Sequence, residues 1–265
     1  MIIETINQIE PSQQKRSQDR GVLFGDGFFT TGIIEAGRVK HLALHLNRLE
    51  ESVAHFNFDG FDASELNAEI STIAARIAQA TFRITVSRVQ SPRGYQVSPD
   101  QSCKISILLT PWLAAPAQHC HAFFAQTPIS VNPALAGFKH LNRLDSVLAA
   151  SECQSAEQEA IMTAGEQVIC GSKSNLFVYH QQSWITPRLD QAGIRGLTRH
   201  RLIEAARLAG INIVEGTVTK NMLESCQAAF LTNSILGIWP ISHIGNISLD
   251  TQICHDLQSQ LNFLR

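Results

Sequence analysis

The chain has 265 residues, with 21 lysines and arginines against 23 aspartates and glutamates and a formal net charge of −2. Its length allows one large domain or two smaller ones, and its nearly even charge argues against nucleic-acid binding, which needs a basic face. No apolar run reaches the roughly 18 residues that a membrane span needs, and residues 1–20 lack the apolar core of a signal peptide, so we expect a cytoplasmic protein without membrane contact.

Apolar periodicity predicts a first group of elements before residue 110. In chain order they are a strand at Gly32–Glu35, helices at His41–Phe56 and Ala63–Gln79, and strands at Phe82–Ser87 and Lys104–Leu109.

A stretch rich in proline and alanine, TPWLAAPAQH, follows this group. We therefore predict an N-terminal domain at residues 1–109, a linker at 110–119 and a larger C-terminal domain at 120–265. An ordinary loop within a single domain is the alternative.

A second group of elements follows the predicted linker. In chain order it contains a strand at His121–Ala125, a helix at Arg143–Gln154, strands at Glu159–Thr163, Gln167–Ile169, Leu176–His180 and Ser183–Thr186, a helix at Arg199–Ala209, strands at Asn212–Glu215 and Ala228–Thr232, and a helix from about Ser248 to Leu264. This mixture of hairpins and helices predicts the α+β class.

The six cysteines form no CxxC pair. We expect reduced and mostly buried thiols. The only close histidine pairs are His41/His45 and His119/His121, and no carboxylate or cysteine group completes a zinc pattern around them, so we expect no metal.

Lys139, in GFKHLNRLDSVLAASE, is a candidate catalytic amine. It follows apolar residues at an element junction, where loss of hydration would lower the pKa of a lysine and make it a nucleophile or base. A solvated loop lysine is the alternative.

Two glycine-bearing stretches are candidate anion-binding loops. In TPRLDQAGIRGLTRH, the backbone N–H groups of Leu197 and Thr198 and the Thr198 hydroxyl stand at a predicted helix start; a plain N-cap is the alternative. In FLTNSILG, the small polar residues Thr232, Asn233 and Ser234 follow a strand, and a simple turn is the alternative.

Arg48 stands among leucines on a predicted helix, in HLNRLE. An arginine that is buried there needs an anion or a hydrogen-bond acceptor. One candidate amine, two anion loops and this arginine together match the needs of a cofactor that bears an aldehyde and a phosphate.

Several of these stretches occur together, and in the same order, in a known family. The motifs are FGDGFFTT, HLNRLE, RGY at 93–95, KHLNRLDSVLAASE, SNLF, TPRLDQAGIRGLTR and TNS, between about residues 19 and 245. On these motifs the chain resembles the 4-amino-4-deoxychorismate lyases. These are pyridoxal-phosphate enzymes of fold type IV, whose relatives include branched-chain and D-amino-acid aminotransferases.

The resemblance implies a fold and a set of site residues. The implied fold has a smaller N-terminal α/β domain and a larger C-terminal domain, with pyridoxal 5'-phosphate between them, in a homodimer. Lys139 matches the lysine that binds the cofactor aldehyde covalently, and Arg48 matches the arginine on its phosphate. The remaining matches are Leu197, Thr198, Asn233 and Ser234 near the phosphate, Asn175 in the framework of the site, and Thr30, Thr31, Arg88, Arg93 and Tyr95 on the substrate side.

Cys170 departs from the family pattern. Relatives carry a glutamate there that pairs with the pyridine nitrogen, whereas this chain reads VICGSKSNLF. Glu166 lies in a predicted hairpin turn and should point elsewhere. A neutral thiol holds a protonated ring nitrogen poorly, although a thiolate could replace the carboxylate.

The resemblance implies a lyase that acts on a small molecule and converts 4-amino-4-deoxychorismate to p-aminobenzoate and pyruvate, a step towards folate. A fold type IV aminotransferase is one alternative. A catalytically impaired relative that still binds the cofactor is the other, because of Cys170.

Overall fold

The computed structural model describes residues 2–6, 19–89, 94–97, 103–112 and 118–263. By its contacts the chain divides into two compact units. One comprises Met1–Leu113 with Lys139–Asn142, and the other comprises Ala114–Phe138 with Arg143–Arg265. The first division falls inside the segment predicted as a linker. The segment Lys139–Asn142 lies with the N-terminal unit, although the sequence placed it in the C-terminal domain.

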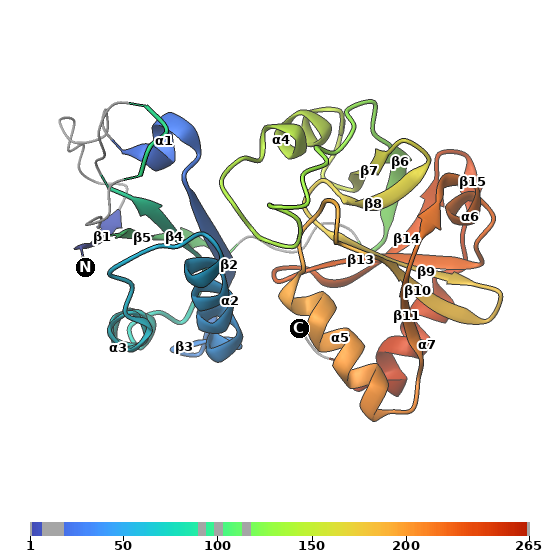
Figure 1. Ribbon diagram of the computed structural model, residues 1–265. Coiled ribbons are helices and arrows are strands. Elements are labelled where there is room, and N and C mark those ends of the chain that lie inside the picture. Colours follow the sequence, from blue (N-terminus) through green and yellow to red (C-terminus); the bar gives the residue numbers. More distant parts are fainter. Residues whose placement is uncertain (1, 7–18, 90–93, 98–102, 113–117, 264–265) are drawn as a thin grey trace. The chain divides into compact units, whose positions relative to one another are not determined.

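The N-terminal unit is built on a five-stranded sheet in the order β1-β5-β4-β2-β3 (Figure 1). The strands are β1 (Ile2–Ile6), β2 (Gly27–Glu35), β3 (Arg38–Val39), β4 (Gln79–Arg88) and β5 (Cys103–Pro111), and the helices are α1 (Arg20–Phe24), α2 (Leu42–His55) and α3 (Ala63–Ala74). β2 and β4 pair antiparallel over their whole shared length, from Gly27 opposite Ser87 to Glu35 opposite Gln79.

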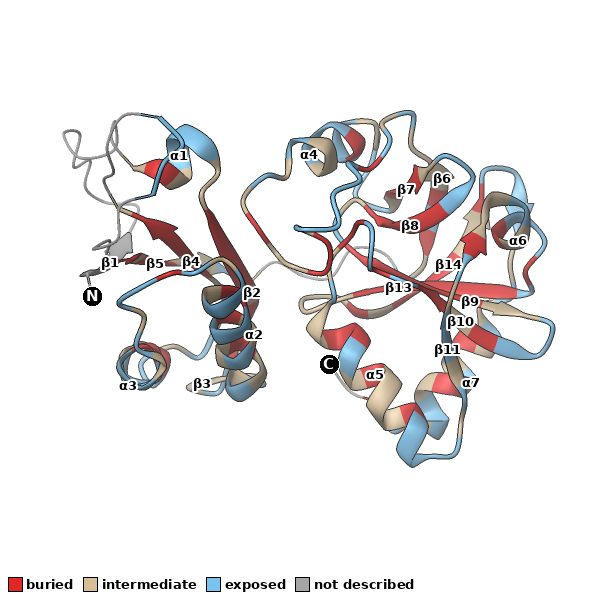
Figure 2. Ribbon diagram, viewed as in Figure 1, coloured by how far each residue is buried: buried red, intermediate tan, exposed pale blue. Residues whose placement is uncertain are grey.

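One face of this sheet forms the core of the N-terminal unit. Phe28, Phe82 and Ile84 on the strands pack with Leu49 of α2 and Ile70 of α3. Side chains alternate between the two faces of a strand, so Phe29, Thr31 and Arg83 belong to the opposite face. The buried, red strands and the buried inner sides of α2 and α3 are visible in Figure 2.

The C-terminal unit contains a ten-stranded sheet, ordered β11-β10-β9-β13-β14-β6-β7-β8-β12, with β15 paired to β14. Its strands are β6 (Cys120–Phe124), β7 (Gln158–Ala164), β8 (Gln167–Gly171), β9 (Asn175–His180), β10 (Ser183–Pro187), β11 (Ile213–Gly216), β12 (Val218–Thr219), β13 (Ala228–Asn233), β14 (Gly237–Ile244) and β15 (Ile247–Ser248). Its helices are α4 (Leu144–Ser151), α5 (Leu197–Leu208), α6 (Lys220–Glu224) and α7 (Gln252–Gln260).

The large sheet separates three apolar clusters. The first lies along β6, β9, β13 and β14. The second joins β7 and β8 to Ala149 of α4. The third packs Leu202 of α5 and Leu257 of α7 against Phe177 and Phe230. Helix α4 and the pair α5 and α7 therefore cover separate parts of the sheet.

Several elements differ from the prediction, among them the following. The strand predicted at Gly32–Glu35 begins at Gly27. The helix predicted at Ala63–Gln79 ends at Ala74, because Gln79 already begins β4. The segment Gly237–Ile244, where the sequence predicted no strand, is β14.

Candidate active site

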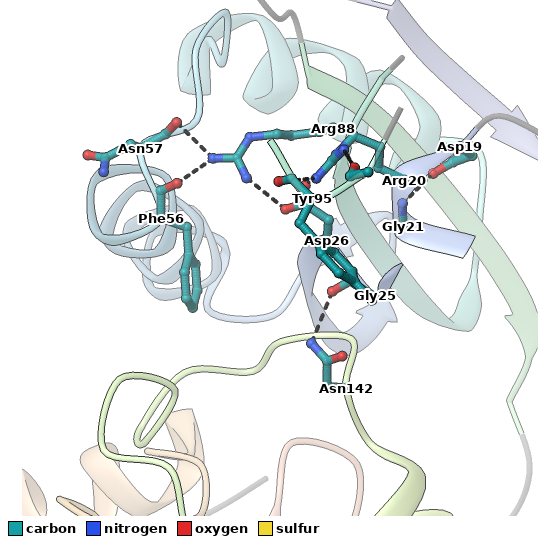
Figure 3. Close-up of polar contacts among 11 residues, drawn as sticks. Asp19, Arg20, Gly21, Gly25, Asp26, Phe56, Asn57, Arg88, Tyr95 and Asn142 are labelled. Carbon is teal, nitrogen blue, oxygen red and sulfur yellow. Dashed lines mark hydrogen bonds and ion pairs between the residues drawn. The ribbon is translucent and has the colours of Figure 1, made fainter. Parts of the chain in front are cut away.

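Lys139 lies on a short segment that pairs with β2. Phe29 N–H donates to the Lys139 carbonyl at 2.9 Å, and Leu141 N–H donates to the Gly27 carbonyl at 2.9 Å. At the end of this segment, Asn142 Nδ2 donates to the Gly25 carbonyl at 3.2 Å (Figure 3). The candidate lysine is thus held by main-chain bonds to β2, as a rigidly placed active-site group would be.

Phe29 is shared by two cations, Lys139 and Arg83. Lys139 Nζ lies 4.5 Å from the centre of the ring, and the Arg83 guanidinium carbon lies 3.6 Å from it. Burial lowers the pKa of Arg83, and Arg83 makes no ion pair among the described residues; its Nε donates to Thr85 Oγ1 at 3.2 Å. Two cations on one ring favour an anionic ligand beside the lysine.

Arg83 was not among the predicted site residues, although the sequence carried a signal. In FRITV, apolar residues alternate with polar ones, and an arginine inside such a strand needs an explanation.

Thr30 and Thr31 point to opposite faces of β2, so the structure separates two residues that the resemblance placed together. Thr30 is 0% exposed, and its Oγ1 lies 2.6 Å from His45 Nδ1 on α2. Thr31 is half-buried on the face that carries Phe29 and Arg83. A substrate role is therefore better supported for Thr31 than for Thr30.

Arg48 lies one helical turn after His45 on α2. Burial lowers the pKa of the Arg48 guanidinium to about 10, while Glu51 raises it. Burial, Arg48 and His41 lower the pKa of His45 to about 3, so its ring is neutral. The surroundings of α2 thus disfavour positive charge, and an anion near Arg48 would offset this.

Arg88 belongs to a network centred on Asp26 (Figure 3). Asp26 accepts from Arg20 Nε and from Arg88, each at 2.7 Å. Arg88 also donates to the carbonyls of Phe56 and Asn57. These contacts favour a framework role for Arg88, and its predicted contact with substrate gains no support.

The same network holds the loop that carries Tyr95. Arg20 donates to the Gly94 and Tyr95 carbonyls at 3.0 and 3.2 Å, while the Tyr95 side chain is 84% exposed and its ring contacts Phe24. The backbone is fixed and the ring is available to a ligand. Arg93 lies outside the described residues.

Cys170 of β8 is buried beside α4. Its strand partner is Met162, which shares its cluster with Ala149. Burial raises the pKa of the thiol to about 12, against a lowering by Arg143, which favours the neutral thiol over the thiolate alternative. Glu166, as its hairpin position predicts, is exposed and pairs with Lys220 at 3.4 Å.

Asn175 and the start of α5 lie together. Asn175 Nδ2 donates to the Ile194 carbonyl at 2.8 Å, and a side chain at Gly196 would collide with Asn175 Oδ1. Gly196 is the N-cap of α5, and no side chain caps the helix. The first N–H groups of this helix, including those of Leu197 and Thr198, are thus available to an anion.

The second loop follows β13. Asn233 Oδ1 accepts from the N–H groups of Ile235 and Leu236 at 2.9 and 2.8 Å, so its side chain shapes the turn, and Ser234 lies half-buried within that turn. Thr232 Oγ1 is buried and has no hydrogen-bond partner in the described residues. An unpaired buried hydroxyl at such a point suits a polar ligand.

These groups fit a phosphorylated aldehyde. Within the C-terminal unit, the uncapped start of α5 and the unpaired Thr232 hydroxyl supply donors for a phosphate. In the described part of the chain no cluster of histidine, cysteine and carboxylate side chains is arranged to hold a metal.

A family model described as amino-transferase class IV matches residues 27–244. The chain belongs to this family. It is 27% identical over 232 residues to the aminodeoxychorismate lyase of Vibrio harveyi, across 85% of this chain and 86% of that protein. It is 28% identical over 240 residues to a D-alanine aminotransferase of Listeria monocytogenes, across 88% and 83%.

Solved structures agree with this membership. The 4-amino-4-deoxychorismate lyase of Pseudomonas aeruginosa superposes with a TM-score of 0.89 at 31% identity over 96% of both chains. A branched-chain aminotransferase of Escherichia coli, at 19% identity and a TM-score of 0.81 over 93% of this chain and 87% of that one, shares the fold. The resemblance drawn from the motifs and the α+β fold type IV class are therefore confirmed. Among the described helices, none is long and apolar enough to cross a bilayer.

Proposed function

We propose that this chain is a pyridoxal-phosphate-dependent lyase that converts 4-amino-4-deoxychorismate to p-aminobenzoate and pyruvate. The observation that carries the proposal is the pair of cations on Phe29: Lys139 for proton transfer and Arg83 beside it for a carboxylate. This substrate bears two carboxylates and a ring amine. The likeness to the lyases of Vibrio harveyi and Pseudomonas aeruginosa supports the choice.

The proposed roles follow from the chemistry of the side chains. Pyridoxal phosphate supplies an electron sink for the carbon that bears the amine. Lys139 would hold the cofactor covalently, and its amine would serve as the general base for the proton on that carbon. The bond from the ring to the enolpyruvyl oxygen breaks, the ring becomes aromatic, and Lys139 returns a proton to the departing group, which leaves as pyruvate.

Binding of the cofactor and substrate is divided among other residues. We assign the phosphate to Arg48, the N–H groups of Leu197 and Thr198, and the loop of Asn233 and Ser234. Arg83 and Thr31 face the substrate, and Tyr95 presents an exposed ring to it. Cys170 lies at the pyridine nitrogen, and Asn175 holds the start of α5.

An aminotransferase is the second candidate, because D-alanine aminotransferases match the chain about as well in sequence. Cys170 favours the lyase over it. A neutral thiol supports little charge on the cofactor ring, and transamination must store a full carbanion's charge there, whereas the lyase reaction is also driven by formation of an aromatic ring.

Product analysis separates the candidates. Purified protein is mixed with pyridoxal phosphate and 4-amino-4-deoxychorismate, without any keto acid, and p-aminobenzoate and pyruvate are measured. We expect equal amounts of both. Faster turnover of D-alanine or a branched-chain amino acid with 2-oxoglutarate would favour the aminotransferase. Cofactor binding without either reaction would indicate an impaired relative.

The covalent link is tested separately. Borohydride reduction of the cofactor-loaded protein should leave the cofactor on Lys139 in peptide mapping. The same amount of label on a Lys139→Ala variant would refute this assignment. We also propose a homodimer, as the resemblance implies, and sedimentation measurements test it.

A further inference from the structure

Glu159 of β7 is a buried carboxylate, with 0% of its surface exposed. Its Oε1 accepts from the hydroxyls of Ser172 and Ser174, at 3.2 and 3.0 Å, and from Lys173 N–H at 3.0 Å. Its Oε2 lies 3.3 Å from Lys173 Nζ in an ion pair, without hydrogen-bond geometry. Burial of a carboxylate is tolerated only with such partners, and here all of them come from one turn.

That turn, residues 171–174, closes tightly around the carboxylate. Gly171 N–H donates to the Ser174 carbonyl at 2.9 Å. A side chain at Gly171 would collide with the Ser174 hydroxyl and with Glu159 Oε1. The space beside Gly171 is filled, and one carboxylate accepts from three donors of the turn, so Glu159 ties the turn to β7.

The turn and the residue that follows it, Asn175, contact the two candidate phosphate loops. The Lys173 carbonyl accepts from Asn233 Nδ2 at 3.4 Å. Asn175, which follows the turn directly, donates to the Ile194 carbonyl at 2.8 Å just before α5. The loop after β13 and the start of α5 are far apart in sequence. The turn contacts the first directly, and Asn175, next to the turn, contacts the segment that precedes the second.

We propose that Glu159 is a positioning residue for the two phosphate-binding loops of the C-terminal unit, an inference that rests on the proposed function. Glu159 acts through the turn and does not touch the cofactor. The strand register supports this separation, because Glu159 shares a face of β7 with Ile161, whereas Cys170 lies opposite Met162 on the other face. Glu159 therefore fixes loops and does not replace the missing glutamate at the pyridine nitrogen.

A purely structural role is the competing explanation, and a pair of ligands distinguishes the two. Pyridoxal has the ring and aldehyde of pyridoxal phosphate but lacks the phosphate. Misplaced phosphate loops weaken binding of pyridoxal phosphate selectively, whereas general loosening of the unit weakens binding of both ligands.

The experiment uses the full chain freed of cofactor, with Glu159→Gln as the test variant. The matched control is Glu166→Gln, which removes a carboxylate that is 82% exposed and paired with a lysine at the neighbouring hairpin. Dissociation constants for both ligands are measured by absorbance titration below the unfolding range of each variant. We expect pyridoxal phosphate to bind Glu159→Gln on the order of 10-fold more weakly, with pyridoxal changed by less than about threefold. The control should bind both ligands as the wild type does.

Binding of pyridoxal phosphate to the wild type tests the proposed function. The inference about Glu159 is tested by whether Glu159→Gln weakens binding of pyridoxal phosphate more than binding of pyridoxal. Equal weakening of both ligands, or unchanged affinity for pyridoxal phosphate, would overturn the inference. If Glu159→Gln does not fold, Ser174→Ala decides in its place, because it removes one donor and leaves the carboxylate paired. Ser174→Ala should weaken binding of pyridoxal phosphate by a smaller factor than Glu159→Gln and again leave binding of pyridoxal nearly unchanged. If Ser174→Ala shows no such selective weakening, the inference is overturned.

Discussion

Arg83 is the residue on which the choice of substrate depends most directly. Its guanidinium packs on Phe29 beside Lys139, and it makes no ion pair in the described part of the chain. Arg83→Gln keeps a donor and removes the charge. We expect the KM for 4-amino-4-deoxychorismate to rise on the order of 10-fold or more, because a charge-assisted contact with a carboxylate is lost. Affinity for pyridoxal phosphate should stay within about twofold.

Steady-state kinetics and a cofactor titration check this prediction. Arg38→Gln, on the exposed edge strand β3, is the control. A fall in kcat at unchanged KM would place Arg83 at the proton transfer and away from substrate binding.

Cys170 gives a prediction about the cofactor's electronic state. Because burial raises the pKa of this thiol to about 12, thiol ionisation should leave the absorbance of the bound cofactor unchanged between pH 6 and pH 9. Cys170→Glu places a carboxylate near Arg143, whose positive charge already lowers the pKa of the thiol at this position. We expect the variant to gain aminotransferase activity by a larger factor than it gains lyase activity.

Cys170→Ser is the control, since it is neutral and of similar size. Both rates and the cofactor spectrum are recorded for each variant. Equal rates in the wild type and Cys170→Glu would mean that residue 170 does not face the ring nitrogen.

Helix α2 and strand β2 are joined by a buried pair, Thr30 and His45, that should make stability depend on pH. The native pKa of His45 is about 3, against 6.5 for an ordinary histidine. Below pH 6.5, His45 is protonated in the unfolded chain but stays neutral in the native protein. The free energy of unfolding therefore decreases as the pH falls. Between pH 7 and pH 5 this site should lower the free energy of unfolding by about 2 kcal/mol.

Urea unfolding of the wild type and of His45→Gln at pH 7, 6 and 5 measures this effect as the difference between their pH slopes. His55→Gln, at an exposed position of the same helix, is the control and should keep the slope of the wild type. Equal slopes in the wild type and His45→Gln would show that His45 is protonated in the native state.

Elements that depend on local periodicity were predicted well, and those that depend on distant partners were not. Helix α2 was predicted to within one residue at each end. The first half of β2 was missed because it is fixed by pairing with β4 and with the segment at Lys139. Pro240 made the β14 segment look unlike a strand, yet it lies opposite Phe230 in the sheet.

At the scale of the whole molecule, motifs supplied most of the candidate ligand-binding residues, and the coordinates added Glu159 and Arg83. Lys139 and Arg48 stand in recognisable local patterns. Glu159 and Arg83 belong to none of the family motifs, and their partners, at the turn 172–174 and at Phe29, are known only from the structure. Likewise, the sequence could not separate Thr30 from Thr31 before the faces of β2 were known.

The segment Lys139–Asn142 is a second, separate part of the N-terminal unit. The chain leaves the N-terminal unit after Leu113 and returns to it only for Lys139–Asn142. The segment Lys139–Asn142 pairs with β2 at Phe28. Strand β3 does not cover this part of β2, because it pairs only with Ile34 and Glu35. An edge strand without such cover exposes unpaired N–H and C=O groups. We therefore expect the main-chain bonds of the segment to support both stability and the position of Lys139.

Leu141→Pro removes the N–H that donates to the Gly27 carbonyl, and Leu141→Ala is the control, because it loses the side chain and keeps the N–H. The free energy of unfolding of the proline variant should be about 1–3 kcal/mol lower than that of the alanine variant, since a buried carbonyl is left unpaired. It should also lose protection of the Phe29 amide against hydrogen exchange, because that amide donates to the carbonyl of Lys139 on the same segment. Equal stability and equal exchange in the two variants would mean that side-chain packing, and not the strand pairing, holds the lysine in place.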